Sequence, residues 1–215
     1  ITVSVTSRTP GTHVNTIPIG GLTATAGGSP VSNNNPASAP LVVNPNTTGY
    51  SLGNRVWFDT DNSGTINGTE VGSNGVKVDL YAADINGNPT GAILNTQTTA
   101  NGGYYRFDNL PAGNYVVVIP ASEFGAGGVL DGYWSSGTTL SGAGTAETTA
   151  PASNTDIDSD DNGTLQLNGA VISSAVTLGP GSSEPTGELD LSGTGQGTAD
   201  NFANMTVDFG FYRVE

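Results

Sequence analysis

Cysteine is absent from all 215 residues, and His13, Lys77 and Met205 are each the only residue of their type. Without cysteine there is no disulfide framework, no thiolate metal site and no cysteine nucleophile. An enzyme that needs a histidine base or a lysine nucleophile would depend on those single copies. These absences count against the common catalytic classes.

Basic charge is scarce as well, since five Lys and Arg stand against nineteen Asp and Glu, for a formal net charge of −14 at pH 7. Nucleic-acid binding needs clustered basic side chains on the phosphates, so we expect no nucleic-acid partner. No apolar run approaches the ~20 residues that span a bilayer, and an anionic membrane surface would repel the chain. We therefore expect no membrane insertion of this chain. The first residues carry neither a basic nor an apolar leader, which is typical of a mature, trimmed or excised chain.

Glycine, threonine, asparagine and serine are abundant, with 32 glycines alone, and this composition favours short strands joined by tight turns. No stretch has a helical period. In the last predicted strand Met205, Val207, Phe209 and Phe211 share one face. Alternating or continuous apolar runs predict a strand that ends at residues 56–58 and further strands over residues 76–81, 104–107, 115–119, 171–178 and 205–211. We expect an all-β fold, an antiparallel β-sandwich.

The acidic residues divide the chain, because residues 1–58 contain none and Asp59 is the first. We expect residues 1–45 to be a partial Ig-like β segment of three or four strands, and residues 46–215 to form the sandwich. A segment of that size with few large side chains can hardly bury a core alone. It would pack on the main domain, be a remnant of a preceding repeat, or donate the alternating strand at residues 1–5 to the sheet of another subunit.

One segment, residues 59–70, has the ligand spacing of a twelve-residue calcium loop. Calcium takes six to eight hard oxygens, which such a loop can wrap around one ion. Gly64 at the sixth position permits a sharp turn, and Ile66 at the eighth ties the loop to a core. The oxygen donors at positions one, three, five, seven (through its carbonyl), nine and twelve are Asp59, Asp61, Ser63, Thr65, Asn67 and Glu70.

The alternative for this loop is a solvated turn rich in Asn, Asp and Gly. The matching spacing favours calcium. The flanking segments 55–58 and 75–78 are predicted strands, so the loop has the ligands of an EF-hand without its helices. We therefore expect a structural ion and no opening switch.

Two further places are candidate calcium sites, giving one to three ions in all. Four carboxylates within six residues repel one another unless a cation neutralises them, although such a run is often only a solvated acidic loop. Those four residues are Asp156, Asp158, Asp160 and Asp161. The third candidate is residues 84–88, with Asp108 or Asn101 as added ligands, and a plain hairpin turn is the equal alternative there.

Several motifs together resemble the B repeats (SdrD B-like, Cna-B-like) of serine-aspartate-repeat surface adhesins. The motifs are LGNRVWFD at 52–59, GVKVDL at 75–80, NGGYYRF at 101–107, LPAGNY at 110–115 and VDFGFY at 207–212. The resemblance covers about residues 51–212. It implies a calcium-rigidified β-sandwich that serves as a stalk segment on the bacterial cell surface, with Asp59, Asp61, Ser63, Thr65 and Glu70 as one site. The Gly/Ser/Thr-rich stretch 179–203 departs from the family pattern.

We accordingly expect a structural, extracellular module that contacts other copies or neighbouring modules of its surface protein, as a stalk segment or a filament-forming subunit. Catalysis is not expected, because the acids cluster as metal ligands, His13 has no nearby carboxylate, and the glycine-rich residues 193–197 lack the strand and helix of a phosphate-binding loop. The alternative is a module that binds a glycan or a host protein through exposed aromatics. Tyr133 and Trp134 are the candidates for that surface, whereas Trp57 is expected in the core.

Overall fold

The computed structural model describes residues 11–43, 49–141, 144–147, 150, 159–182, 184–189 and 191–213. The chain forms two compact units, Ile1–Thr47 and Thr48–Glu215. Strands dominate both, and the only helices in these ranges are two short 3-10 turns, η1 (Ala121–Phe124) and η2 (Asp200–Phe202). Nowhere in the described ranges is a helix long and apolar enough to cross a membrane.

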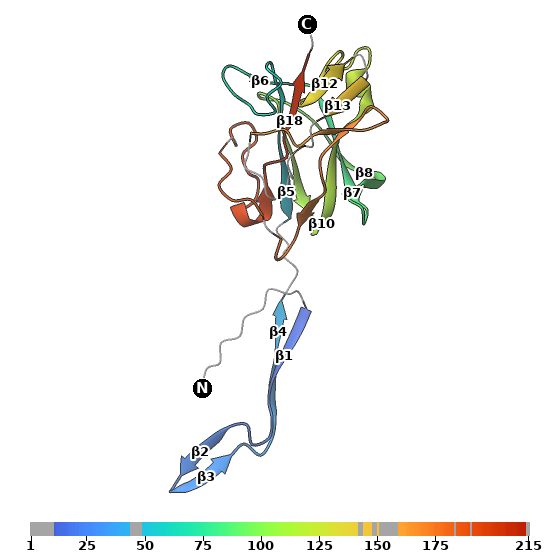
Figure 1. The fold of residues 1–215 in the computed structure, drawn as a ribbon. Helices are drawn as coiled ribbons and strands as arrows, with labels where there is room; N and C mark the ends of the chain where they lie inside the picture. Colours follow the sequence, from blue (N-terminus) through green and yellow to red (C-terminus); the bar gives the residue numbers. More distant parts are fainter. Residues whose placement is uncertain are drawn as a thin grey trace. The chain divides into compact units, whose positions relative to one another are not determined.

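The second unit is a β-sandwich of two six-stranded sheets (Figure 1). One sheet has the order β14-β15-β10-β7-β8 with β16 also on β10, and the other has the order β11-β18-β5-β17 with β6 and β9 also on β5. The first contains β7 (Lys77–Ala83), β8 (Pro89–Thr98), β10 (Gly113–Ile119), β14 (Thr164–Leu165), β15 (Val171–Ile172) and β16 (Val176–Leu178). The second contains β5 (Tyr50–Phe58), β6 (Val71–Gly72), β9 (Tyr104–Leu110), β11 (Trp134–Ser135), β17 (Ala203–Asn204) and β18 (Phe209–Tyr212). A separate hairpin joins β12 (Thr138–Ser141) to β13 (Gly144–Glu147).

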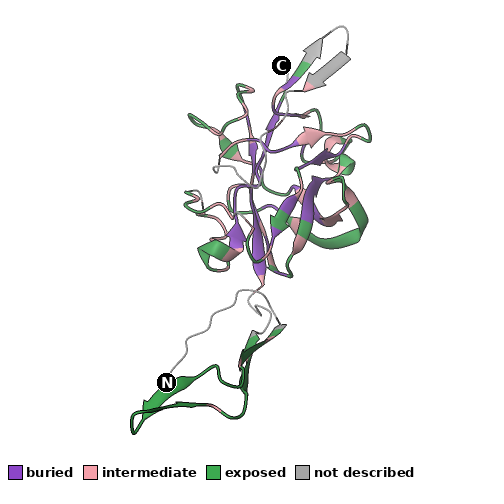
Figure 2. Cartoon of the chain, turned by 60° about the horizontal axis from the view of Figure 1, so that its bottom comes forward, coloured by how far each residue is buried: buried purple, intermediate pink, exposed green. Residues whose placement is uncertain are grey.

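The core lies between the two sheets, where the apolar side chains of the predicted strands meet. The purple strands of Figure 2 mark this buried layer. Its largest members that are almost fully enclosed include Leu52, Leu80, Phe107, Phe209 and Phe211. The all-β sandwich is therefore confirmed. It differs from the expectation in one respect: β17 and β18 run parallel to β5, whereas the other pairings of the sandwich are antiparallel.

Two predicted strands are interrupted where a side chain takes the place of a backbone hydrogen bond between strands. The stretch 171–178 divides into β15 and β16, because the Ser173 hydroxyl accepts the Val117 N–H at 3.0 Å between them. The stretch 205–211 is regular only in β18, since the Asp208 N–H donates to the Asn162 side chain at 2.9 Å instead of to a strand. Met205 and the other apolar side chains of that stretch are buried as predicted, but Asp208 is buried too.

The first unit is a ribbon of paired strands. β1 (Gly11–Ile17) pairs antiparallel with β4 (Ala37–Val43), and β2 (Thr23–Ala26) pairs with β3 (Ser29–Ser32). Its side chains are largely exposed, with Val14 at 63% and Ile19 at 67% exposure, and the ribbon is almost entirely green in Figure 2. Paired strands without a second layer are marginally stable in water. The predicted strand at residues 1–5 lies outside the described residues.

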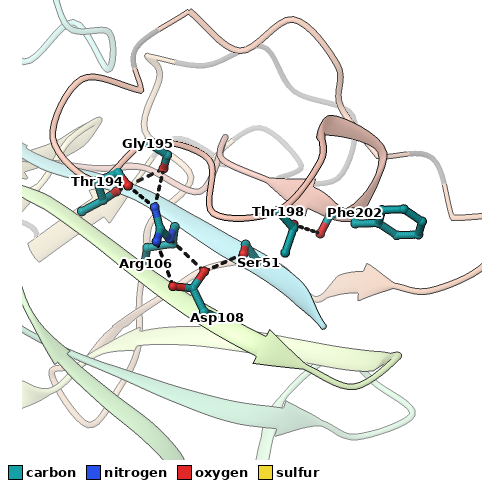
Figure 3. A network of polar contacts seen from close by, with 7 residues as sticks. All are labelled: Ser51, Arg106, Asp108, Thr194, Gly195, Thr198 and Phe202. Atoms are coloured by element: carbon teal, nitrogen blue, oxygen red, sulfur yellow. Dashed lines mark hydrogen bonds and ion pairs between the residues drawn. The ribbon is translucent and has the colours of Figure 1, made fainter. Parts of the chain in front are cut away.

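The Gly/Ser/Thr-rich stretch that departs from the family pattern lies against β9, where residues 191–198 form a strap (Figure 3). The Arg106 guanidinium donates to the carbonyls of Thr194 and Gly195, at 3.0 Å to the latter, and pairs with Asp108 at 2.8 Å. A Cβ on Gly193 would lie 2.0 Å from the Tyr104 ring, so only glycine permits this approach. The strap is thus bound by side chains of β9 along its length.

Candidate metal centre

The 59–70 loop leaves the sandwich at the end of β5 and returns at β6. The Asp59 N–H donates to the Phe211 carbonyl at 2.8 Å, and Phe58 pairs with Val71 where the loop closes. Both ends of the loop are therefore fixed in one sheet. Within it, Asn62, Gly64 and Gly68 have positive φ angles of 57°, 74° and 54°, which turn the chain sharply.

Asp59 is the buried end of the site. One carboxylate oxygen accepts the N–H of Ser63 at 3.1 Å, and the other accepts the N–H of Gly64 at 2.8 Å and the hydroxyl of Ser136 at 2.7 Å. The loop therefore folds back over its own first residue. Its sharp turn at Gly64 is the one predicted from the spacing.

The middle residues of the loop are linked to one another by hydrogen bonds on its exposed side. The Asn67 amide donates to the Asp61 carboxylate at 3.2 Å and to the Ser63 hydroxyl at 3.0 Å, and that hydroxyl donates to the Thr65 carbonyl at 3.0 Å. Hydrogen bonds from the side chains of Ser63 and Asn67 lower the pKa of Asp61 below its usual value, and burial opposes them. Asp61 is therefore charged at neutral pH.

Glu70, the twelfth residue of the loop, is the last of the predicted oxygen donors. One of its oxygens accepts the Thr60 N–H at 2.6 Å, and the other accepts the Asn67 N–H at 3.0 Å. Carboxylate oxygens of Asp59, Asp61 and Glu70 lie within 4.8 Å of one another. The loop thus gathers hard oxygens around one point, which is the donor set that calcium prefers.

A segment that the sequence did not identify braces this loop. Residues 136–138 lead from β11 into the first residue of β12, and besides the Ser136 hydroxyl they supply the Gly137 N–H, which donates to the Asn62 side chain at 2.8 Å. The Asn62 amide in turn donates to the Thr138 carbonyl at 3.3 Å. Small polar residues of this kind give no signal in a chain so rich in Ser, Thr and Gly.

The second acidic segment lies directly beside the first loop. The Asp161 N–H donates to the Gly64 carbonyl at 2.9 Å, the Ile66 N–H donates to the Ser159 carbonyl at 2.9 Å, and Thr65 forms a bridge with Asp160. Asp156 and Asp158 lie outside the described residues. Two segments that are separate in the sequence therefore meet in one region of the fold.

Asp161 is buried within that region. One of its oxygens accepts the N–H groups of Gly163 and Gly210, both at 3.0 Å. Burial raises the pKa of Asp161 well above its usual value; the two N–H donors oppose this, and the negative charges of Glu147 and Asp59 add to it. Glu147, at the end of β13, is an acidic neighbour that the spacing of the sequence did not reveal.

The third candidate calcium site, residues 84–88, has the hydrogen bonds of an ordinary hairpin turn. One Asp84 oxygen accepts the N–H groups of Asn86 and Asn88, both at 2.8 Å, within the turn between β7 and β8. Asp108 does not join it, because its carboxylate is bound by Arg106 and by the Ser51 hydroxyl at 2.6 Å. We assign no ion to this turn.

The aromatic side chains considered for ligand binding have mainly structural contacts. Trp57 and Tyr104 are buried. Tyr133 packs on Phe58 with 4.8 Å between ring centroids, and the Arg213 guanidinium lies 5.7 Å from its ring. Trp134 is half-buried and lines an open groove of about 560 Å³.

Comparison with known proteins agrees with this architecture. The model of the SdrD B-like domain family matches residues 50–189. A fibrinogen-binding protein of Staphylococcus epidermidis is 51% identical over 71 residues, which is 33% of this chain and 6% of that protein. Serine-aspartate repeat-containing protein C of Staphylococcus aureus is 42% identical over 73 residues, 34% of this chain and 7% of that protein. The matches thus span a small fraction of the relatives' length. Since the family model covers more than half of the residues, the chain belongs to the SdrD B-like domain family.

Proposed function

We propose that this chain is a calcium-stabilised structural module of an extracellular bacterial surface protein, where it acts as an adhesin stalk segment or a filament subunit. The observation that carries the proposal is the 59–70 loop, whose carboxylates converge to within 4.8 Å. Asp59, Asp61, Ser63, Thr65, Asn67 and Glu70 would be the calcium ligands. Asp160 and Asp161, beside that loop, would contribute to a second ion together with Asp156 and Asp158.

A structural role for the ion follows from how the loop is attached. Its two ends belong to β5 and β6, which pair with each other, so binding would fix the loop without moving one element against another. Extracellular calcium modules work with Kd values of about 10⁻⁴–10⁻³ M, and calcium outside cells is plentiful enough to fill such sites. The proposed cell-surface location and the proposed ion therefore support each other.

A ligand-binding module is the weaker alternative. One relative carries the name fibrinogen-binding protein, but the match covers only 6% of that protein. Of the aromatic side chains considered, Trp57 and Tyr104 are buried, Tyr133 packs on Phe58, and Trp134 alone borders an open groove. These contacts favour the structural role, as a stalk segment or a filament subunit, over ligand binding.

The test is a calcium titration of the whole chain by isothermal calorimetry. We expect saturable binding, and we expect Glu70→Gln to remove one calcium equivalent because the variant loses the charge of the twelfth ligand. Asp131→Asn, which removes an exposed carboxylate elsewhere, is the matched control and should bind as the wild type does. Equal stoichiometry and affinity in all three proteins would refute the calcium site in this loop.

We propose further that the first unit contacts another copy or a neighbouring module. Its ribbon exposes apolar side chains such as Val14 and Ile19, and paired strands with no second layer gain stability by joining another sheet. Donation of the alternating strand at residues 1–5 to such a sheet would link modules head to tail.

Deletion of residues 1–10 tests this link. We expect the shortened chain to stay monomeric in light scattering and electron microscopy under conditions in which the full chain assembles, because the donated strand is gone. The calcium titration should be unchanged, since the 59–70 loop is intact. Undiminished assembly of the shortened chain would contradict strand donation.

A further inference from the structure

The ribbon of the first unit has two edges of different composition. The half that comes first in the sequence, β1 and β2, has no proline within its strands, whereas the returning half has Pro30 within β3 and Pro40 within β4. Proline cannot donate a hydrogen bond to a neighbouring strand, and in an edge strand its nitrogen faces away from the existing partner. Both prolines therefore interrupt the outer edge of the returning half. The outer edge of β1 and β2 has no such interruption.

The register of the ribbon indicates which backbone groups of β1 face this open edge. In an antiparallel ladder, opposite residues alternate between pairs that exchange both backbone bonds and pairs whose backbone groups point outward. Pro40 lies opposite Val14 and has no N–H, so this pair is of the second kind. By the two-residue period, the backbone groups of Thr12 and Thr16 also point outward. Among the described residues, β1 pairs with no strand except β4.

No device that protects natural edge strands is found on β1. Such strands usually carry charged side chains, prolines or bulges. β1 pairs with β4 in an unbroken register over its 7 residues, and residues 11–43 contain no Asp, Glu, Lys or Arg. Thr12, Val14 and Thr16 are β-branched, which favours the extended backbone of a strand. The open edge of β1 is therefore suited to accept another strand.

The longest edge strand of the sandwich, β8, is a poorer acceptor. Its register against β7 shifts between Leu80 and Ala82. A bulge of this kind bends the strand and breaks its row of hydrogen-bonding groups. The Thr96 N–H also donates to the Asn95 side chain, at 2.8 Å, and is thereby occupied. The ribbon thus presents a more regular edge than β8 does.

We propose that the open edge of β1 is the acceptor for residues 1–7 of another copy of this chain. The proposal rests on the strand donation proposed above and names the strand that receives it. The segment ITVSVTS alternates apolar and hydroxyl side chains and has no charged side chain. Its apolar residues can extend the face on which Val14 and Val42 lie exposed. The ribbon would thereby gain a third strand, and three strands with an apolar face are the fewest that make a sheet stable by itself.

The sequence favours donation to another copy over a hairpin within one chain. A tight hairpin between residues 1–7 and β1 would have to turn within residues 8–10, because Gly11 already pairs with Val43. The favoured short turns need a residue with positive φ, usually Gly or Asn. Residues 8–10 are Arg, Thr and Pro, and proline is confined to a φ near −65°.

Disulfide formation between engineered cysteines tests the acceptor, because the chain has no cysteine of its own. Chains with Val3→Cys are mixed with chains that carry Val14→Cys, and the mixed disulfide dimer is counted by mass spectrometry after mild oxidation. Val42→Cys is the matched control, since Val14 and Val42 share one face and are 63% and 60% exposed, but Val42 lies on the far strand β4. We expect at least five times more mixed dimer with Val14→Cys than with Val42→Cys.

A pair of proline variants tests the same edge without cysteine. Thr16 of β1 lies opposite Ser38 of β4. Thr16→Pro removes an N–H from the open edge, whereas Ser38→Pro adds a proline to the edge that Pro40 already interrupts. We expect Thr16→Pro to abolish assembly in light scattering, as deletion of residues 1–10 should, and Ser38→Pro to assemble as the wild type does.

The outcomes separate the acceptor from strand donation itself. If deletion of residues 1–10 abolishes assembly but Val14→Cys and Val42→Cys form equal amounts of mixed dimer, donation stands and the β1 edge is refuted. Assembly that survives the deletion would refute both. A disulfide within single chains of a Val3→Cys, Val14→Cys double variant would reveal a hairpin in one chain and exclude donation to β1 of another copy. Should Thr16→Pro disrupt the ribbon, the disulfide yields decide.

Discussion

Removal of calcium by a chelator is expected to lower the melting temperature of this chain by roughly 5–10 °C for each ion released. An ion bound only by the folded state at a hundredfold excess over Kd contributes about 2.7 kcal/mol, and each kcal/mol moves the melting temperature of a chain of this size by about 2–4 °C. The loss arises where the carboxylates of Asp59, Asp61 and Glu70 lie within 4.8 Å of one another. Without the ion their mutual repulsion is uncompensated.

The measurement is differential scanning calorimetry in calcium and in chelator, with limited proteolysis to locate the change. Asp59→Asn should show a smaller difference between the two solutions than the wild type, because the increment of the ion in the 59–70 loop is lost with the buried ligand. Cleavage in chelator should fall between residues 59 and 70. Asp131→Asn should respond to calcium as the wild type does. Identical wild-type curves with calcium and with chelator would overturn the structural role of the ion.

Acid should act in the same direction as the chelator. Hydrogen bonds from Ser63 and Asn67 lower the pKa of Asp61, so its stabilising contribution is fully present above the ordinary carboxyl pKa and is lost as the pH falls through the lowered value. Protonated ligands also release the metal. The calcium-dependent part of the melting temperature should therefore vanish in acid before the chain unfolds.

Replacing the buried Gly103 by alanine is expected to destabilise the sandwich strongly. Gly103 has a φ of 90°, and an added Cβ would lie 2.0 Å from the Val56 carbonyl and 2.8 Å from the Gly72 Cα. The strain of a left-handed residue and the overlap with two strands together should cost about 2–5 kcal/mol. The carbonyl of Val56 would have to give up its bond to the Ser73 N–H, now 2.8 Å long.

The neighbouring glycine is the matched control. Gly102 has a φ of 99°, but its added Cβ would meet only the Tyr104 ring at 3.6 Å, an ordinary contact. Gly102→Ala should therefore cost only the backbone strain, about 1–2 kcal/mol. Urea unfolding of both variants compares the cost of backbone strain alone with the cost of strain and steric overlap together. Equal destabilisation would show that β5, β6 and β9 are not held in place by the close approach at Gly103.

The convergence of carboxylates in the 59–70 loop was predictable because they lie within one continuous segment. Spacing alone indicated that Asp59, Asp61 and Glu70 would come together and that the chain would turn sharply at Gly64, which has a φ of 74°. The strands were predictable for a similar reason, since burial between two sheets requires apolar side chains at regular positions. Neither prediction needed knowledge of distant contacts.

The sequence alone did not reveal the contacts between segments that are far apart in the chain. Nothing local indicates that Asp161 would bond to Gly64, or that Glu147 would lie beside Asp161. The interruption at Ser173 was not predictable either, because nothing in the sequence shows that its hydroxyl takes the place of a backbone hydrogen bond between strands.

The parallel pairing of β5 and β18 has a mechanical consequence. These are the first and last strands of the second unit, and Val56, Trp57 and Phe58 lie opposite Phe209, Gly210 and Phe211. A pull on the chain before Tyr50 and after Tyr212 acts on opposite ends of this pair, so it slides the strands lengthwise instead of peeling them apart. In that direction the bonds between the strands share the load and must break together. We therefore expect this pairing to resist extension of the second unit between its two ends.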